Sequence, residues 1–514
     1  MDKKFNDLCY ACRIGDLENI DRLIASGANV NGLDRFDNTP LFLASLCGHI
    51  EAVKLLLSRG AVCDRDRYEG ARCIYGALND SIRDVLLEYD ISKAVDIKQP
   101  FAIHVSALFN NSSLECQDIV FRFNSDCEFR LHRLLLAARS PYFYEKLTTV
   151  WKDKSIIEMP YGESLNAFAL VVKFLYLIPV LHEVTQHDYK FLKMFCEKLA
   201  IPSLAEYINT VNHFIYSSKK RTYINELQFK FTEEAKSQLR SFMVNNILKK
   251  KISTEDYRDI PDNELNSMRD GGSMMDIFLL VKTGEYSGYI YPAHRSILMR
   301  AEYFKVMFTS PFSESAGYKR TDNNILDRYQ KFPIITLPSS DLHVAEVILS
   351  YLYFDCLEIP WEWAIEVLMV ANALLIDRLK SMAAVTIMQS HQLLERHSIF
   401  EVLYAAWDTG MERLEQYAAK IIVDNLDRYS ADEELKAAIL MSAERINCRQ
   451  ETDTIELVDD MRYYLLKKYA LTLEDFRLLE CHHNIDLRKK HRLLKYNRDL
   501  ESIDTILLEL KLDA

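Results

Sequence analysis

The chain has 514 residues, of which 49% are hydrophobic and 27% are charged, and its formal net charge is −12. A chain of this length usually folds as about three domains, and this composition is that of an ordinary globular protein. The acidic balance is unfavourable for binding phosphate groups and therefore argues against a nucleic-acid-binding protein.

The sequence contains no stretch that resembles a secretory signal or a membrane span. The first residues, MDKKFNDLCY, have no apolar run, and the most apolar stretch, 165–181, contains Asn166, Lys173 and Pro179. The 11 cysteines are expected as buried thiols in a reducing compartment and not as a disulfide framework. We therefore expect a cytoplasmic protein, with the nucleus as a second location, that does not bind a membrane.

The first 90 residues repeat themselves with a shift of 33 positions. Small residues (Ala11, Ala44) let two short helices approach, and Gly15 and Gly48 permit the turn between them. Further glycines are expected to end the second helix of each unit in the left-handed conformation. The superposed pairs are Leu8 and Leu41, Ala11 and Ala44, Gly15 and Gly48, Leu23 and Leu56, Gly27 and Gly60, and Ala28 and Ala61.

This pattern resembles the ankyrin repeat, with its best match at Thr39–Ala61, which opens on Thr39-Pro40. Phe42 replaces the histidine that is usual in the family, so an apolar contact is expected there. A weaker third unit follows at 72–89, and the ankyrin segment is taken as 1–95. The resemblance implies a protein-binding face, and the alternative is that so short a stack only packs on its neighbour.

Cys9 and Cys12 have the spacing of two zinc ligands, but the stretch offers no second pair. The repeat pattern places Cys12 on the first helix, opposite Ser45 of the next unit. We therefore predict packed thiols at both positions.

Two later stretches share a strand followed by a helix. Asp118 opens the first strand and Asp276 the corresponding strand, 158 residues later. His132 and His294, 162 residues apart, stand where a strand leads into a helix. A histidine at this place can tie the strand to the helix, and we favour that structural role over a catalytic or metal-binding role.

Both stretches resemble the BTB/POZ domain, at 110–210 and 274–385. The resemblance implies a small sheet wrapped by about five helices. It also implies pairing, either between the two copies within one chain or between chains as a homo-oligomer. Leu131 departs from the family pattern, and Gly317–Lys331 is expected as an inserted loop in solvent.

The remaining segments are expected to be helical. Residues 211–273 are predicted as a charged helix followed by an acidic linker that ends in Gly271-Gly272, and 386–514 as a helical region. The basic cluster from Arg488 to Arg492 is interpreted as a solvated helix face, with a nuclear address as the alternative. The predicted fold class is α+β and mostly helical: a short ankyrin stack, two BTB/POZ modules and C-terminal helices.

The clearest interaction signal is Phe312 and Glu314, which follow the first helices of the second copy. In BTB proteins similar to ubiquitin-ligase adaptors, an apolar residue two positions before a glutamate at this place meets the cullin-3 scaffold. Trp151 and Asp153 occupy the corresponding place in the first copy. The alternative is that Phe312 packs within its own module and Glu314 is only solvated.

No phosphate-binding loop, nucleophile elbow or zinc-protease motif occurs in the sequence, so neither an enzyme nor a cofactor is expected. The whole chain resembles the ankyrin-repeat and BTB/POZ domain-containing proteins. The resemblance implies a substrate-recruiting adaptor of a cullin-3 type ubiquitin ligase, with an unidentified client protein. The alternatives are an assembly scaffold without a ubiquitin role and, as a third hypothesis, an unrecognised hydrolase.

Overall fold

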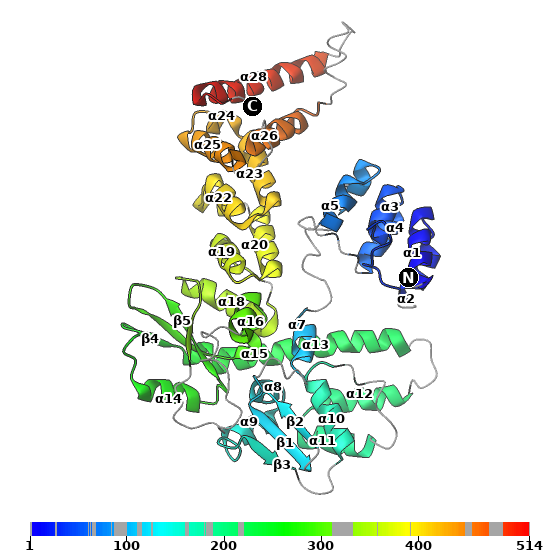
Figure 1. Cartoon of the computed structure of the whole chain (residues 1–514), viewed down its shortest axis with the longest axis vertical. Coiled ribbons are helices and arrows are strands. Elements are labelled where there is room, and N and C mark those ends of the chain that lie inside the picture. The colour runs from blue at the N-terminus through cyan, green and yellow to red at the C-terminus, as the bar shows by residue number, and fades with distance from the viewer. Residues whose placement is uncertain are drawn as a thin grey trace.

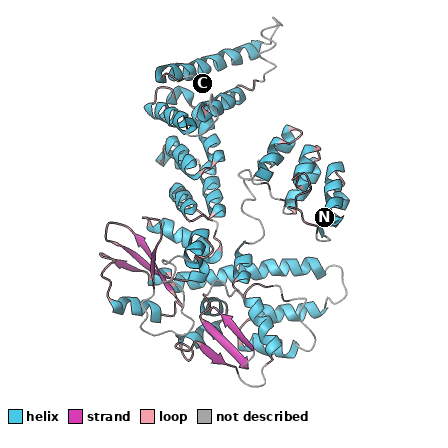
Figure 2. Cartoon of the chain, in the orientation of Figure 1, coloured by secondary structure: helices cyan, strands magenta, loops and turns pink. Residues whose placement is uncertain are grey.

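The computed structural model confirms a mostly helical α+β fold (Figure 1). The strands are confined to two small sheets, and helices form the rest of the molecule (Figure 2). The structure describes residues 3–25, 28–59, 61, 63, 68–83, 85–86, 100–109, 116–124, 127–159, 164–178, 180, 189–213, 220–310, 333–356, 358–390, 392–447, 455–471 and 487–512.

The N-terminal helices form an ankyrin stack with a hydrophobic core of its own. Gly15 and Gly48 adopt φ values of 73° and 84°, which only glycine reaches easily. Gly27 and Gly60 lie outside the described residues. The helices are α1 (Lys3–Ile14), α2 (Leu17–Ala25), α3 (Pro40–Leu46), α4 (Ile50–Ser58) and α5 (Tyr68–Tyr75).

Phe42 packs against the ankyrin core, and the guanidinium of Arg72 covers its ring at 4.4 Å from the ring centroid. Arg72 also donates to the Asn38 side chain at 2.8 Å. Thr39 caps α3 by accepting a hydrogen bond from the Phe42 backbone N–H at 3.1 Å. The expected apolar contact of Phe42 is therefore present, and a cation–π contact from the third repeat adds to it.

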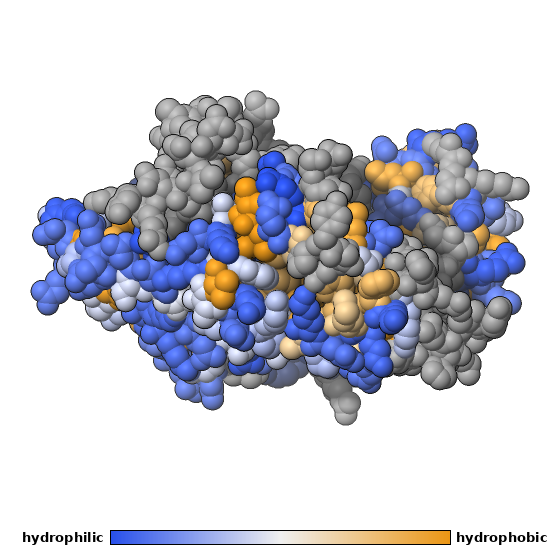
Figure 3. Space-filling view, turned by 90° about the horizontal axis from the view of Figure 1, so that it is seen from below, coloured by the Kyte–Doolittle hydropathy of each residue, from blue (hydrophilic) through white to orange (hydrophobic). Residues whose placement is uncertain are grey.

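The first BTB-like module is built on a three-stranded sheet of order β2-β1-β3, with β1 antiparallel to β2 and parallel to β3. Ion pairs from Arg122 to Glu128 (3.6 Å) and Glu158 (3.1 Å) make the outer face of the sheet polar. Seen from below, the described residues of the molecule are mostly hydrophilic, and apolar residues gather in a few groups (Figure 3). The elements are α7 (Pro100–Ala107), β1 (Ile119–Asn124), β2 (Cys127–Leu131), α8 (Arg133–Arg139), α9 (Pro141–Thr148), β3 (Ile156–Glu158), α10 (Leu165–Leu175), α11 (Tyr189–Lys198) and α12 (Pro202–His213).

The second module repeats this arrangement and adds a strand, giving the order β4-β6-β5-β7. β5 is antiparallel to β6 and parallel to β7, as β1 is to β2 and β3. The elements are β4 (Ile252–Thr254), α14 (Asp262–Asp270), β5 (Ile277–Lys282), β6 (Gly288–Ala293), α15 (Arg295–Leu298), α16 (Glu302–Thr309), β7 (Ile334–Thr336), α18 (Leu342–Phe354), η3 (Trp361–Trp363), α19 (Ala364–Ala373) and α20 (Asp377–Gln389).

The structure differs from the expected acidic linker before the second module. β4 joins the sheet of that module, and Met268 of α14 packs with Phe278, Leu280 and Ile290 on the outer face of the sheet. A few apolar residues among the acidic ones are enough to bury this face. Residues 252–270 therefore belong to the second module, while the expected insert 317–331 lies outside the described residues.

The bridging helix α13 (Lys220–Asn246) and the short η2 (Leu248–Lys250) run between the modules, and the C-terminal helices continue from the second module (Figure 1). Apolar residues of these helices, such as Ile399, Leu403 and Leu414, are buried. The helices are α21 (Leu393–Arg396), α22 (Ile399–Thr409), α23 (Glu412–Asp424), α24 (Leu426–Tyr429), α25 (Glu433–Asn447), α26 (Glu456–Lys468) and α28 (Leu487–Leu510).

Candidate protein-interaction surfaces

Each module closes its strand-to-helix junction with a buried histidine and a buried tyrosine. Nδ1 of His132, at the N-cap of α8, lies 2.8 Å from the hydroxyl of Tyr176. Nδ1 of His294 lies 2.7 Å from the hydroxyl of Tyr353. Because all four side chains are buried, these contacts hold the junction to the end of a neighbouring helix and face no substrate.

The two strand aspartates perform a matching task. The first residue of α8 donates its backbone N–H to Asp118 (Arg133 N to Oδ1, 2.7 Å), and the first residue of α15 donates to Asp276 (Arg295 N to Oδ1, 2.9 Å). The N-cap histidines make no side-chain cap, so these carboxylates satisfy the helix N-termini instead. The four marker residues thus have structural partners in both modules.

The two tyrosines were not predicted, although the sequence contains a signal for them. The tyrosine follows its histidine by 44 positions in the first module and by 59 in the second. This difference matches the length of the expected insert 317–331. Both tyrosines also end an aromatic-Leu-Tyr triplet, Phe174-Leu175-Tyr176 and Tyr351-Leu352-Tyr353.

The two modules pack against each other within the chain, and two helices lie at their junction. α7 precedes the first module but packs on the second, where Nε2 of the partly buried His104 lies 2.7 Å from the carbonyl oxygen of Ser296. α13 lies between the modules and contacts both: the rings of Phe231 and Phe174 of the first module are 4.9 Å apart, and Arg240 lies 5.8 Å from the ring centroid of Phe354 of the second. One hydrophobic core runs through both modules. Burial lowers the pKa of His104 to about 4, so this contact holds a neutral imidazole.

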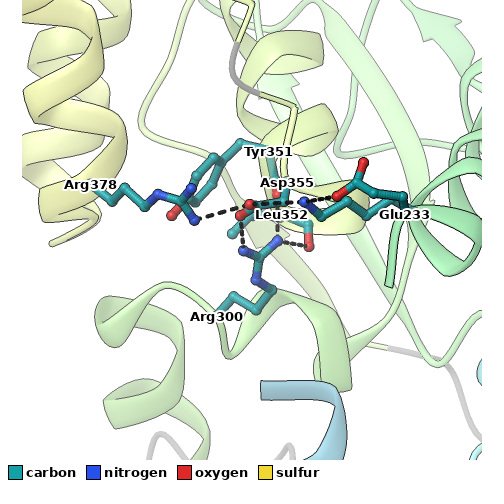
Figure 4. A network of polar contacts seen from close by, with 7 residues as sticks. Glu233, Arg300, Tyr351, Leu352, Asp355 and Arg378 are labelled. Atoms are coloured by element: carbon teal, nitrogen blue, oxygen red, sulfur yellow. Dashed lines mark hydrogen bonds and ion pairs between the residues drawn. The ribbon is translucent and has the colours of Figure 1, made fainter. Parts of the chain in front are cut away.

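A buried carboxylate joins α13 to the second module and the helices that follow (Figure 4). Asp355 has a side chain 1% exposed, and it pairs with Arg300 at 2.6 Å, Arg378 at 2.9 Å and Lys236 of α13 at 3.7 Å. Arg300 also donates to the carbonyl oxygen of Leu352 at 2.7 Å. One acidic side chain therefore pairs with three cations from separate parts of the chain, and Lys236 has a second acidic partner in Glu233 at 2.9 Å.

The second module presents exposed apolar side chains where the chain enters 311–332. Tyr303 and Val306 lie on α16, and Leu375 lies on the turn after α19. The Tyr303 backbone N–H donates to the carbonyl oxygen of Leu374 at 3.3 Å, so the two elements are adjacent. Leu375 is 58% exposed at a φ of 56°, a conformation that is costly for leucine. Phe312 and Glu314 lie outside the described residues, so their contact with a scaffold stays a prediction.

In the first module the corresponding aromatic residue, Trp151, packs within its own module. The ring of Trp151 lies against Phe121 (5.7 Å) and Tyr142 (6.2 Å) of its own module. Asp153 is exposed, and the adjacent Lys152 pairs with Asp270 at 3.7 Å. Packing is thus the role that the structure gives Trp151, and a cullin contact of Trp151 and Asp153 stays a prediction.

The ankyrin stack exposes apolar side chains at the carboxyl ends of α3 and α5. Tyr75, the last residue of α5, is 70% exposed. Leu46, the last residue of α3, and Leu78, which follows α5, are also exposed. The Leu78 backbone N–H donates to the Ser45 carbonyl oxygen at 3.2 Å and links the two repeats at this place. This edge is a candidate surface for a protein partner.

Other expected chemistry is assigned as follows. Cys9 and Cys12 are buried, and burial raises their pKa values to about 11 and about 12, which keeps them as packed thiols. Within the described parts of the chain, no group of three His, Cys, Asp or Glu side chains is placed to hold a metal ion. No described helix is long and apolar enough to cross a bilayer.

Comparisons with known proteins agree with this architecture. The family model of ankyrin repeats matches residues 8–57, and that of the BTB/POZ domain matches 107–213 and 265–391. An ankyrin repeat-containing protein of Saccharomyces cerevisiae is 46% identical over 100% of this chain and 99% of its own length. BTB/POZ domain-containing protein 3 of Schizosaccharomyces pombe is 36% identical over 100% of this chain and 90% of its own length.

Proposed function

The chain belongs to the ankyrin-repeat and BTB/POZ domain-containing proteins, and on this premise we propose that it is a non-catalytic adaptor that brings a client protein to a cullin-3 type ubiquitin ligase. Both kinds of module are protein-interaction modules. The observation that carries the proposal is the exposed apolar face of Tyr303, Val306 and Leu375, which adjoins the segment that contains Phe312 and Glu314.

In this proposal the ankyrin segment or the first module selects the client, and the second module docks the cullin. The adaptor makes or breaks no bond itself. It raises the effective concentration of client lysines near the ligase by tethering both partners. We place this work in the cytoplasm, with the nucleus as a second location, because the described cysteines are free thiols, which are typical of reducing compartments.

The docking contact is tested by pull-down of cullin-3 with the full chain. The double variant Phe312→Ala/Glu314→Ala is expected to reduce recovery by more than about tenfold, because an anchor residue and its polar neighbour are lost together. Tyr75→Ala, which removes an exposed ring from the ankyrin stack, is the matched control and should recover cullin as the wild type does. Undiminished recovery with the double variant would refute the assigned contact.

Self-assembly through the BTB modules is less well supported. The two modules already pack on one another within the chain, since α7 contacts the second module and one hydrophobic core runs through both. We therefore expect a monomer at micromolar concentration in light scattering. A concentration-dependent dimer or larger assembly would favour the alternative function, an assembly scaffold without a ubiquitin role.

A further inference from the structure

The two modules share a backbone at the candidate docking face but differ in its side chains. The turn residues Leu375 and Ala200 have φ values of 56° and 54°. The next hydrogen bond is also the same, because Ile376 N donates to Ala371 O and Ile201 N to Cys196 O, both at 2.9 Å. The fold of the face is thus conserved within the chain, and its chemistry can be compared position by position.

Where the second module has apolar residues on this face, the first module has charged or smaller ones. Counted from Tyr303 and Tyr142, the exposed Val306 of the second module corresponds to the exposed Glu145 of the first. Met307 corresponds to Lys146 in the same way. Leu375 corresponds to Ala200, so the first module lacks the apolar side chain that the second presents at this turn.

Contacts within the chain cover part of α9 in the first module, although Glu145 stays exposed. The ring of Trp151 packs on Tyr142, and the Lys146 ammonium lies 5.6 Å from the centroid of the same ring. The segment that enters the second module passes against α9, since a Cβ atom on Gly272 would lie 3.0 Å from the hydroxyl of Tyr144. The salt bridge of Lys152 with Asp270 ties the same segment to the turn after α9.

We propose that each chain offers one scaffold docking face, that of the second module, and binds one cullin molecule. The inference rests on the proposed function and adds the stoichiometry of the complex and the reason for it. A partner surface that covers the exposed Val306 and Leu375 removes apolar area from water, which is favourable. If the same partner surface docked on the first module, it would bury the carboxylate of Glu145 without a compensating charge, which is unfavourable. Each chain, although it carries two modules, would therefore recruit a single cullin molecule.

The test uses the full chain and the N-terminal region of cullin-3, with the mass of the complex measured by native mass spectrometry and the affinity by calorimetry. We expect one cullin per chain. Val306→Glu/Leu375→Ala, which gives the second face the residues of the first, should weaken binding by more than about tenfold. Glu145→Ala/Lys146→Ala on the first module is the matched control and should leave the affinity unchanged. Tryptophan fluorescence confirms that each variant is folded.

The possible outcomes separate the two claims. Absence of any complex with the wild type would overturn the proposed function and this inference with it. Two cullins per chain, or a loss of affinity caused by the first-module variant, would overturn only the inference. Wild-type affinity of the folded second-module variant would do the same, because the cullin would then dock elsewhere.

Discussion

Replacement of Asp355 by alanine is expected to lower the free energy of unfolding of the paired modules by about 3–5 kcal/mol. The variant leaves Arg300, whose side chain is 4% exposed, and the largely buried Arg378 and Lys236 without their shared counter-charge. Removing one partner of a buried ion pair is costly because the desolvated charges that remain have no compensation. The loss of Asp355 affects Arg300 and Arg378 most, because Lys236 keeps its closer ion pair with Glu233 at 2.9 Å.

A second variant separates charge from backbone conformation. Asp355 ends α18 in the left-handed region, with a φ of 59°. Asparagine adopts this conformation readily, whereas alanine pays about 1 kcal/mol for it. We therefore expect Asp355→Asn to destabilise the modules nearly as much as alanine, because the charge and not the turn dominates.

Urea unfolding followed by tryptophan fluorescence measures this effect selectively. The four tryptophans, Trp151, Trp361, Trp363 and Trp407, all lie outside the ankyrin repeats. The control Asp504→Ala removes an exposed partner of Arg462, 3.1 Å away, and should change stability by less than about 1 kcal/mol. A loss no larger than that of this control for both Asp355 variants would contradict the role of the buried network.

The local features of the sequence were the most predictable. The glycine turns at Gly15 and Gly48 follow from a repeat in which each unit carries its own signal. Asp118 and His132 could be recognised because a strand followed by a helix recurs with similar spacing at Asp276 and His294. In these cases the residues that define the element are close together in the chain.

The long-range partners could not be inferred in this way. Asp355 stands at the end of an apolar helix, and nothing near it in sequence indicates that Lys236 and Arg378 meet there. The sequence of β5 indicates why the segment before it is more than a linker. Residues 277–281 of β5 are apolar without interruption, which is typical of a strand covered on both faces. That pattern required a cover, and the segment that contains Met268 supplies it.

Acidification is expected to destabilise the paired modules through two histidines, the buried His294 and the partly buried His104. Burial lowers the pKa of both His104 and His294 from the ordinary value of 6.5 to about 4. Arg300 and Lys305 add to the effect at His104, whereas Asp276 opposes it at His294. Because the folded protein holds both rings neutral, their contribution to stability is complete above pH 6.5 and falls as the pH is lowered toward 4. At pH 5 the loss is roughly 2 kcal/mol for each histidine.

The variant His104→Gln isolates one of these contributions. The glutamine amide can still donate to the carbonyl oxygen of Ser296, which the imidazole contacts at 2.7 Å, but it takes up no proton. The variant should therefore lose about 2 kcal/mol less stability than the wild type between pH 7.5 and pH 5. Urea midpoints from tryptophan fluorescence at both pH values give this difference, in which the carboxylates cancel because they titrate in both proteins. Equal pH dependence of variant and wild type would mean that His104 is not a buried neutral contact between the modules. The pairing that we describe would then lose one of its main contacts.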